Sequence, residues 1–130
     1  MYRKALVIDD SELERYLSEK LIRKYHFAEH VMCFNSAVEA LAYLHNVADT
    51  PGNFPDIIFL DIHMPLMTGF EFMDKYLEFP AYLKEQCSII LFSSTDAYVD
   101  HVKMKSYPVI HKFVRKPLSE AKLNDLRVRE

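Results

Sequence analysis

The sequence predicts an α/β protein whose parallel sheet is covered by helices on both faces. Short runs such as residues 57–60 and 89–92 are wholly apolar and lack the alternation of a strand with one face in water, so both of their faces are expected to be buried. Segments with helical signals separate these runs along the chain, and alternating strands and helices are typical of a parallel sheet.

The first strand is expected at residues 4–9 and its helix from Ser11 to about residue 25. Ser11 and Glu14 form a Ser-x-x-Glu capping box, in which each side chain accepts a hydrogen bond from a free backbone amide of the first turn. The buried stripe of this helix is predicted from leucines that recur every four residues: Leu13, Leu17 and Leu21.

The second strand is expected at residues 30–34, and a second Ser-x-x-Glu signal follows it at Ser36 and Glu39. The buried face of the helix that begins there is predicted to include several apolar residues: Ala37, Val38, Leu41 and Leu44. The stretch 47–55 contains Thr-Pro-Gly-Asn and is expected to be a loop.

The third strand is expected to end at Asp61, and the irregular Pro- and Gly-containing sequence after it predicts a loop leading into a helix at residues 69–77. That helix is expected to place three apolar residues on one face: Phe70, Met73 and Leu77. The fourth strand is expected at residues 88–93. The helix after it, around residues 97–107, has a poor apolar pattern and β-branched residues that lower its helix propensity.

A fifth strand at residues 111–115 and a short helix after Ser119 complete the series. Five strand–helix units fit a three-layer α/β/α sandwich of the flavodoxin-like type, with a five-stranded parallel sheet of order 2-1-3-4-5. In such a sheet ligands bind beyond the carboxyl ends of the strands, at the switch point between strands 1 and 3. The functional site is therefore expected at the ends of those two strands.

The totals fit one domain covering residues 1–130, with a formal charge of −3 that argues against nucleic acid as the main partner. No apolar stretch approaches the ~20 residues needed to span a bilayer, and the first residues lack a signal-peptide core. Cys33 and Cys87 lie far apart without metal-type spacing. They are expected to be reduced core cysteines of a cytoplasmic protein.

Charged side chains stand at the ends of three predicted strands: Asp9 and Asp10, Asp61, and Lys116. Crowded carboxylates repel one another unless a cation neutralises them, and an all-oxygen set of ligands suits Mg²⁺. A carboxylate can itself be the nucleophile that forms an aspartyl-phosphate, with a lysine as a compact positive charge beside the transferred oxygens. A hydroxyl for the same oxygens is expected from the end of the fourth strand, from Ser93 or, with less weight, Ser94.

Each of these short motifs alone also has a plain structural explanation as a turn or as the lead-in to a helix. Their joint placement carries the inference, and with it the chain resembles the receiver domain of a two-component response regulator over essentially all of its 130 residues. The resemblance is carried by residues in the family's order and spacing: Asp9-Asp10, Asp61, Met64-Pro65, Gly69, Ser93-Ser94 and Lys116-Pro117.

The resemblance implies that Asp61 is the phosphoacceptor. It implies a magnesium site made by three carboxylates and one backbone carbonyl: those of Asp9, Asp10 and Asp61, and the carbonyl of His63. It further implies that Lys116 is essential for the chemistry, that Ser93 is a switch hydroxyl drawn towards the phosphoryl group, and that Phe113 is an aromatic that changes rotamer on activation. Pro117 is implied to follow a cis peptide bond, which proline makes accessible.

His63 departs from the asparagine or other small-to-medium residue that is usual two positions after the phosphoacceptor. Because the side chain at this position overhangs the phosphoryl group in the family, we hypothesise that His63 and Ser94 set the lifetime of the phosphorylated state. The segment 107–110 also lacks the small residues typical before the fifth strand.

The sequence therefore predicts a stand-alone, chemotaxis-regulator-like signalling switch of the cytoplasm. It is expected to take a phosphoryl group from a sensor histidine kinase or a histidine phosphotransfer protein. It would signal to an unknown downstream protein through the face formed by the helix at 97–107, the fifth strand and the last helix. It is expected to bind no nucleic acid and no membrane, and to be an enzyme only in catalysing its own phosphorylation and dephosphorylation.

Two alternatives stay open at this point. One is a pseudo-receiver, a protein-interaction module that acts without phosphorylation. The other is a phosphatase with an aspartyl nucleophile of the haloacid-dehalogenase type. That chemistry calls for a second acid two residues after the nucleophile, where this chain has His63.

Overall fold

The computed structural model describes residues 1–95 and 97–127, and these residues contain one parallel sheet of five strands. Its order is β2-β1-β3-β4-β5, which confirms the predicted flavodoxin-like architecture. The strands lie close to their predicted positions: β1 (Tyr2–Ile8), β2 (Ala28–Phe34), β3 (Ile57–Asp61), β4 (Ser88–Ser93) and β5 (Ile110–Arg115). All neighbouring strands pair in parallel, so their carboxyl ends meet at one edge of the sheet.

Helices follow the strands along the described chain: α1 (Glu12–Lys24), α2 (Ala37–Val47), α3 (Gly69–Tyr76), α4 (Ala81–Glu85), α5 (Tyr98–Met104) and α6 (Glu120–Leu126). A 3₁₀ turn at Pro51–Asn53 lies in the loop predicted between α2 and β3. The short helix α4 was not predicted from the sequence. It has five residues and no side-chain cap, too little for a periodic signal.

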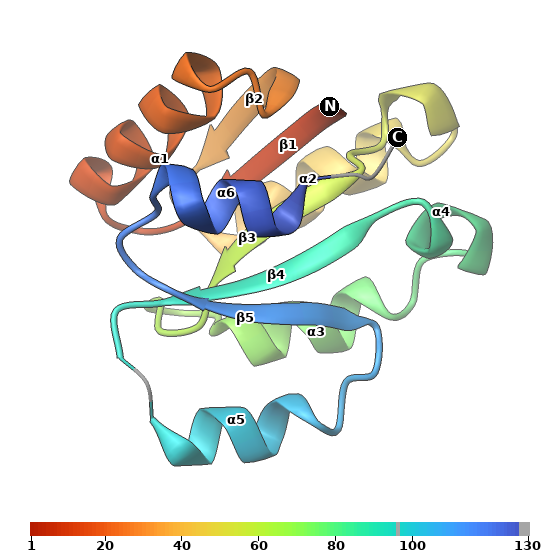
Figure 1. Cartoon of the computed structure of the whole chain (residues 1–130). Helices are drawn as coiled ribbons and strands as arrows, with labels where there is room; N and C mark the ends of the chain where they lie inside the picture. Colours follow the sequence, from red (N-terminus) through yellow and green to blue (C-terminus); the bar gives the residue numbers. More distant parts are fainter. Residues whose placement is uncertain (96, 128–130) are drawn as a thin grey trace.

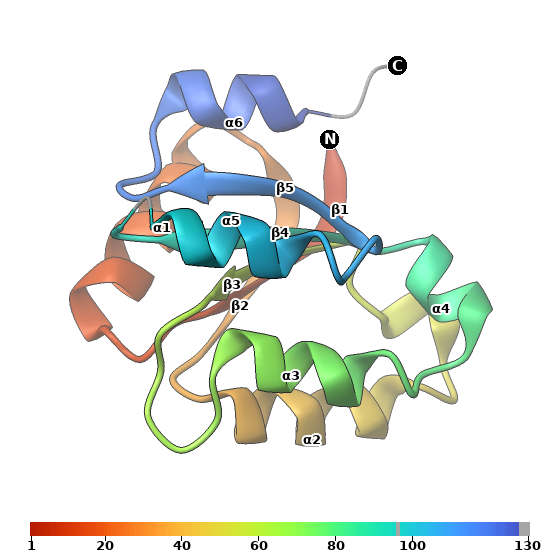
Figure 2. The same ribbon diagram turned by 90° about the horizontal axis from the view of Figure 1, so that it is seen from below.

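The helices form two layers around the sheet (Figures 1 and 2), with α1 and α6 on one face and α2 and α3 on the other. Residues of β1 alternate between the two hydrophobic cores, because successive side chains of a strand point to opposite faces. Leu6 and Ile8 pack in the core under α2 and α3. Ala5 and Val7 pack in the core under α1 and α6. Both faces of β3 and β4 are buried along nearly their whole length, as their unbroken apolar runs predicted, whereas the edge strands β2 and β5 keep exposed residues.

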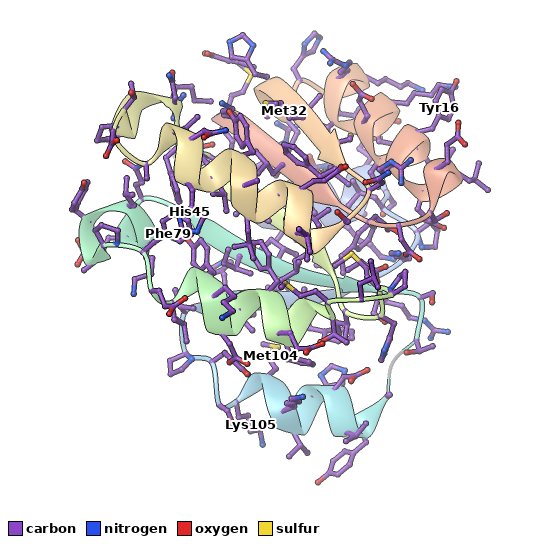
Figure 3. The ribbon with its side chains drawn as sticks, turned by 180° about the vertical axis from the view of Figure 1, so that it is seen from behind. Tyr16, Met32, His45, Phe79, Met104 and Lys105 are labelled. Atoms are coloured by element: carbon purple, nitrogen blue, oxygen red, sulfur yellow. The ribbon has the colours of Figure 1, made fainter. Side chains whose placement is uncertain are left out.

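The hydrophobic core under α2 and α3 extends from the sheet to the loop after α3. Figure 3 shows His45 of α2 beside Phe79, and their ring centroids are 4.6 Å apart. Phe79 also meets the ring of Phe54 at 5.7 Å, in an edge-on arrangement that aromatic pairs favour.

The predicted N-cap serines are present, but the capping box at Ser11 and Glu14 is only half formed, because the backbone N–H of Ser11 donates to Asp9 Oδ1 and not to Glu14. Ser11 accepts a hydrogen bond from the backbone N–H of Glu14 at 3.2 Å, so α1 begins where expected. Part of the predicted apolar stripes is also wrong. Leu13 and Leu17 of α1 are 64% and 37% exposed, while Ser18 and Ile22 are buried. The packed face of the helix is rotated by about one residue from the leucine stripe, because each residue turns the helix by about 100°.

Two further apolar residues predicted to be buried are exposed. Val38 of α2 is 52% exposed, because it lies to one side of the face formed by Ala37, Ala40, Leu41 and Leu44. Leu77 is 39% exposed, because α3 ends at Tyr76 and Leu77 already belongs to the turn. Phe70 and Met73 are buried as predicted.

Both cysteines are free thiols, as expected. Cys87 is buried and Cys33 is half-buried. Burial, and with less effect the nearby Glu19, raises the pKa of Cys33 to about 11. Burial raises the pKa of Cys87 to about 12. Both thiols are therefore protonated and poorly nucleophilic at neutral pH. Among the described helices, none combines the length and the hydropathy needed to cross a bilayer.

Candidate functional site

Three aspartates meet where β1 and β3 end. The two strands are neighbours, and Ile8 lies beside Leu60 in their register. Asp61 is the last residue of β3, and Asp9 and Asp10 follow directly after β1. One carboxylate oxygen from each aspartate lies within 4.8 Å of the others. The structure thus brings together the three acids that the sequence singled out.

Asp9 is the most enclosed of the three acids, with 1% of its surface exposed. Its Oδ1 accepts a hydrogen bond from the backbone N–H of Ser11 at 3.0 Å, and its carbonyl accepts one from Arg15 at 2.8 Å. These bonds tie Asp9 to the start of α1 and leave Oδ2 facing the site. Asp10, in contrast, is exposed.

Lys116 places its ammonium group between two of the acids. Its Nζ lies 2.5 Å from Asp9 Oδ2 and 3.6 Å from Asp61 Oδ1, and its side chain is 7% exposed. The backbone N–H of Lys116 donates to the carbonyl of Ser93 at 2.7 Å, which fixes the lysine against the end of β4. The Lys116–Pro117 peptide bond is cis, as the resemblance implied.

The surroundings of Asp61 disfavour the ionised form of its carboxyl group. Burial and the neighbouring Asp9 raise the pKa of Asp61 to about 7, and the ammonium of Lys116 only partly opposes them. Three carboxylates and one ammonium group, which lies beside two of them, leave an excess of negative charge at a site with oxygen ligands. A divalent cation would offset that charge, and this donor set suits Mg²⁺.

Three other predicted residues lie at the end of β4, just after it and on β5. Ser93 is buried, and its Oγ accepts a hydrogen bond from the backbone N–H of Thr95 at 3.2 Å; Ser94 is exposed. Phe113 is half-buried, and its ring centroid lies 4.1 Å from that of His101 on α5. In the register of β4 and β5, Ser93 pairs with Arg115 and Leu91 with Phe113, so Ser93 and Phe113 are not strand partners. Sequence reasoning missed Thr95, whose bond to Ser93 is set by the local turn.

The side chain of His63 contacts α5, and no pattern in the sequence predicted this contact. His63 Nε2 lies 3.1 Å from Oδ2 of Asp100 on α5. The imidazole is 60% exposed, whereas the Asp100 side chain is 8% exposed. The two residues are 37 positions apart. The one signal for Asp100 in the sequence is that it is an acidic residue within a helix that has a poor apolar pattern. The metal-binding role of the His63 carbonyl stays a prediction.

Gly69 lets the chain pass close behind the phosphoacceptor candidate. Its N–H donates to the carbonyl of Ile62 at 2.8 Å. A Cβ atom at position 69 would lie 2.5 Å from the carbonyl oxygen of Asp61 and 2.9 Å from the Cα of Ile62. Both of these are backbone atoms, so the loop after Asp61 would have to shift.

We expect Gly69→Ala to destabilise the protein by about 1–3 kcal/mol, the usual cost of forcing extra volume into a packed region. Urea unfolding of wild type and variant measures the difference. Gly52→Ala is the matched control, because a Cβ there meets nothing within 4 Å. Equal losses in the two variants would show that the close approach at Gly69 has no energetic consequence.

Comparison with known proteins adds an independent finding. Residues 5–127 match the family model of the response regulator receiver domain. The chain is 31% identical over 121 residues to Protein PilG of Pseudomonas aeruginosa, and the match covers 92% of this chain and 81% of PilG. It is 40% identical over 74 residues to protein-glutamate methylesterase/protein-glutamine glutaminase 3 of Burkholderia thailandensis, a match that spans 57% of this chain and only 19% of the methylesterase.

The fold has close counterparts among solved structures. The crystal structure of a two-component response regulator from Cytophaga hutchinsonii superposes with a TM-score of 0.88 at 29% sequence identity. That superposition covers 96% of this chain and 93% of the other.

Proposed function

The chain belongs to the response regulator receiver domain family, and from that premise we propose that it is a signalling switch that is turned on by phosphorylation of Asp61. The observation that carries the proposal is the grouping of three carboxylates, with one oxygen of each within 4.8 Å of the others, and Lys116 beside two of them. The Nζ atom of Lys116 lies 2.5 Å from Asp9 and 3.6 Å from Asp61. As a receiver domain the chain is a signalling module of a two-component system and not a classical enzyme.

The proposed chemistry is phosphoryl transfer to a carboxylate. An oxygen of Asp61 attacks the phosphorus of a phosphohistidine, the phosphorus–nitrogen bond breaks, and the imidazole of the donor leaves with the electron pair. The donor would be a sensor histidine kinase or a histidine phosphotransfer protein, the partners typical of receiver domains. Phosphorylation adds about −1.5 to −2 of charge and three strong acceptor oxygens to Asp61.

The acids fit a divalent cation, and we propose that this cation is Mg²⁺. Asp9, Asp10 and Asp61 would hold it, together with the backbone carbonyl of His63. When bound, Mg²⁺ offsets negative charge on the transferred oxygens. Lys116 would then turn from Asp9 towards the phosphoryl group as a second positive charge, at a distance that its flexible side chain can span.

Phosphorylation separates this proposal from its alternatives. A pseudo-receiver would keep the fold without accepting phosphate. An aspartyl phosphatase would need a second acid in reach of the substrate, and the residue at that position, His63, points to Asp100 instead.

The test is incubation with Mg²⁺ and acetyl phosphate, followed by intact-mass measurement. We expect the mass gain of one phosphoryl group, lost faster in base than in mild acid, as for an acyl phosphate. Omission of Mg²⁺ should abolish the gain, and Asp61→Asn should not be labelled. An unlabelled wild type, or a label that Asp61→Asn retains, contradicts the proposal.

A second prediction concerns the route from Asp61 to the rest of the domain. The Ser93 hydroxyl accepts a bond from Thr95 and lies at the end of the strand next to β3. We propose that phosphoryl oxygens draw this hydroxyl inward and that Phe113 moves into the vacated space. Ser93→Ala should still be phosphorylated, but with much smaller amide NMR shift changes over residues 97–113.

Ser94→Ala is the control for the NMR experiment, since the exposed Ser94 lies one residue further on. Its amide shift changes on phosphorylation should match those of wild type. A full response in Ser93→Ala would remove Ser93 from the signalling route.

A further inference from the structure

Helix α5 is attached to the rest of the molecule by few apolar contacts. Tyr98, Val99 and Val102 are 83%, 67% and 44% exposed. Asp100 is the one residue of this helix that is buried. Figure 1 shows α5 beside β5, and Figure 3 shows α5 next to α3, with Met104 projecting towards α3 and Lys105 lying on the outer side.

Polar and aromatic side chains provide much of the attachment along one side of α5. At its start, Asp100 meets His63 of the loop after Asp61 at 3.1 Å. In its last turn, Lys103 Nζ lies 4.9 Å from the ring centroid of Phe70. Just beyond its end, the Tyr107 hydroxyl donates to Asp74 of α3 at 2.7 Å. The first of these contacts is the one that reaches the phosphoacceptor loop.

The contact between His63 and Asp100 is unequal in its exposure. Asp100 is a carboxylate with an 8% exposed side chain, and a buried charge is costly unless a hydrogen bond compensates it. His63 is 60% exposed and can find water instead. An ionised carboxylate only accepts hydrogen bonds, so Nε2 of His63 is the donor. Loss of this hydrogen bond is therefore more costly for Asp100, whose buried charge loses its partner, than for His63.

Phosphorylation of Asp61 would create a second acceptor that competes with Asp100 for the Nε2–H group of His63. His63 follows Asp61 by two residues, and the phosphoryl group brings three strong acceptor oxygens into the same loop. The Nε2–H group donates to one acceptor at a time. If it turns to the phosphoryl group, Asp100 loses its partner and α5 must move to bring that carboxylate to water.

We propose that Asp100 is a positioning residue that holds the His63 imidazole against α5 and away from the phosphoryl group. The inference rests on the proposed function. It implies that one equilibrium, between His63 bound to Asp100 and His63 bound to the phosphoryl group, sets both the position of α5 and the lifetime of the aspartyl-phosphate. By reciprocity, a partner that keeps α5 in its observed place also keeps His63 away from the phosphoryl group.

The first test uses the unphosphorylated protein and amide hydrogen exchange of residues 98–104. Asp100→Asn removes the charge of the acceptor, and His63→Asn puts a side chain there that is too short to reach Asp100. Each variant should exchange these amides about fivefold faster, and the double variant should be no faster than the His63→Asn variant, because Asp100→Asn weakens and His63→Asn removes the same contact. Exchange at the wild-type rate in both single variants overturns the role of this contact in holding α5.

The second test measures loss of the acyl phosphate after the donor is removed. In His63→Asn no imidazole shields the phosphoryl group, and loss should be about fivefold faster, equal to about 1 kcal/mol. In Asp100→Asn the imidazole is free to shield the group, and loss should be slower by a similar factor. Opposite signs distinguish competition for His63 from general loosening of the helix.

Tyr107→Phe is the matched control, because it removes the Asp74 hydrogen bond at the other end of α5 and leaves His63 untouched. Its rate of phosphate loss should equal that of wild type. The inference is overturned if Asp100→Asn behaves like Tyr107→Phe in this assay, or if it changes the rate in the same direction as His63→Asn. A wild type that never forms an acyl phosphate overturns the proposed function and the lifetime coupling together, while hydrogen exchange still decides whether the contact holds α5.

Discussion

Asp61→Asn is expected to abolish phosphorylation and, in the metal-free protein, to raise the free energy of unfolding by about 2 kcal/mol at about pH 8. The stabilisation arises because Asp61 is 5% exposed and lies beside Asp9. Ionising it there is costly, and burial and Asp9 raise its pKa from 3.8 to about 7. An asparagine at this position carries no charge and can donate its amide hydrogens to the neighbouring carboxylates.

The effect has a definite dependence on pH. Below pH 3.8 the carboxyl group of Asp61 is protonated in both the folded and the unfolded protein, and it costs no stability. Between 3.8 and about 7 the folded protein binds the proton more tightly than the unfolded one, so the stability of wild type falls as the pH rises. Above about 7 the loss is complete. The difference between Asp61→Asn and wild type should therefore grow with pH and level off near neutrality.

Thermal and urea unfolding with a chelator present, at a series of pH values, measures this difference. Asp49→Asn, which removes an exposed carboxylate from a loop, should show little change. Added Mg²⁺ should stabilise wild type more than Asp61→Asn, because one ligand is lost in the variant. A wild type that is as stable as Asp61→Asn at every pH without metal would show that ionising Asp61 in the folded protein has no energetic cost.

Lys116→Met is expected to have the opposite effect, with a loss of about 3–5 kcal/mol in the metal-free protein at neutral pH. The methionine keeps most of the side-chain volume but leaves Asp9 and Asp61 without the ammonium group that lies 2.5 Å and 3.6 Å from them. Asp9 is 1% exposed, so water cannot replace that partner. Phosphorylation of Asp61 should also fall sharply, because the positive charge near the transferred oxygens is gone.

Urea unfolding and the rate of acetyl phosphate labelling check the two parts of this prediction. Lys112→Met is the matched control, since Lys112 is an exposed lysine of β5, the strand that ends just before Lys116, and should tolerate the change within about 0.5 kcal/mol. Mg²⁺ should restore part of the stability of Lys116→Met by replacing the lost positive charge. If Lys116→Met is as stable as Lys112→Met without metal, the acids do not depend on Lys116.

Local signals in the sequence predicted the sheet and the position of the acids. The run Ile57–Asp61 is apolar up to its last residue and forms the central strand as expected. Ser11 and Ser36 mark the starts of α1 and α2, because a cap satisfies amides only two or three residues away. In a parallel sheet the strand ends meet, and this places Asp9, Asp10, Asp61 and Lys116 together.

Features that depend on the orientation of one element against another were predicted less well. The repeat of leucines in α1 gave a correct helical period but the wrong face, since Ile22 packs inward and Leu13 does not. The hydrogen bond of Ser93 to Thr95 and the short helix α4 depend on turns with no periodic signal.

By itself, then, the chain determined which residues end the strands, because hydrophobicity and capping act over a few neighbouring positions. Only the tertiary structure decided that His63 meets Asp100, 37 positions away, and that polar and aromatic contacts provide much of the attachment of α5. The physical reason is that a side chain's partner across the fold depends on how separate elements pack, and no local pattern in the sequence encodes that distance.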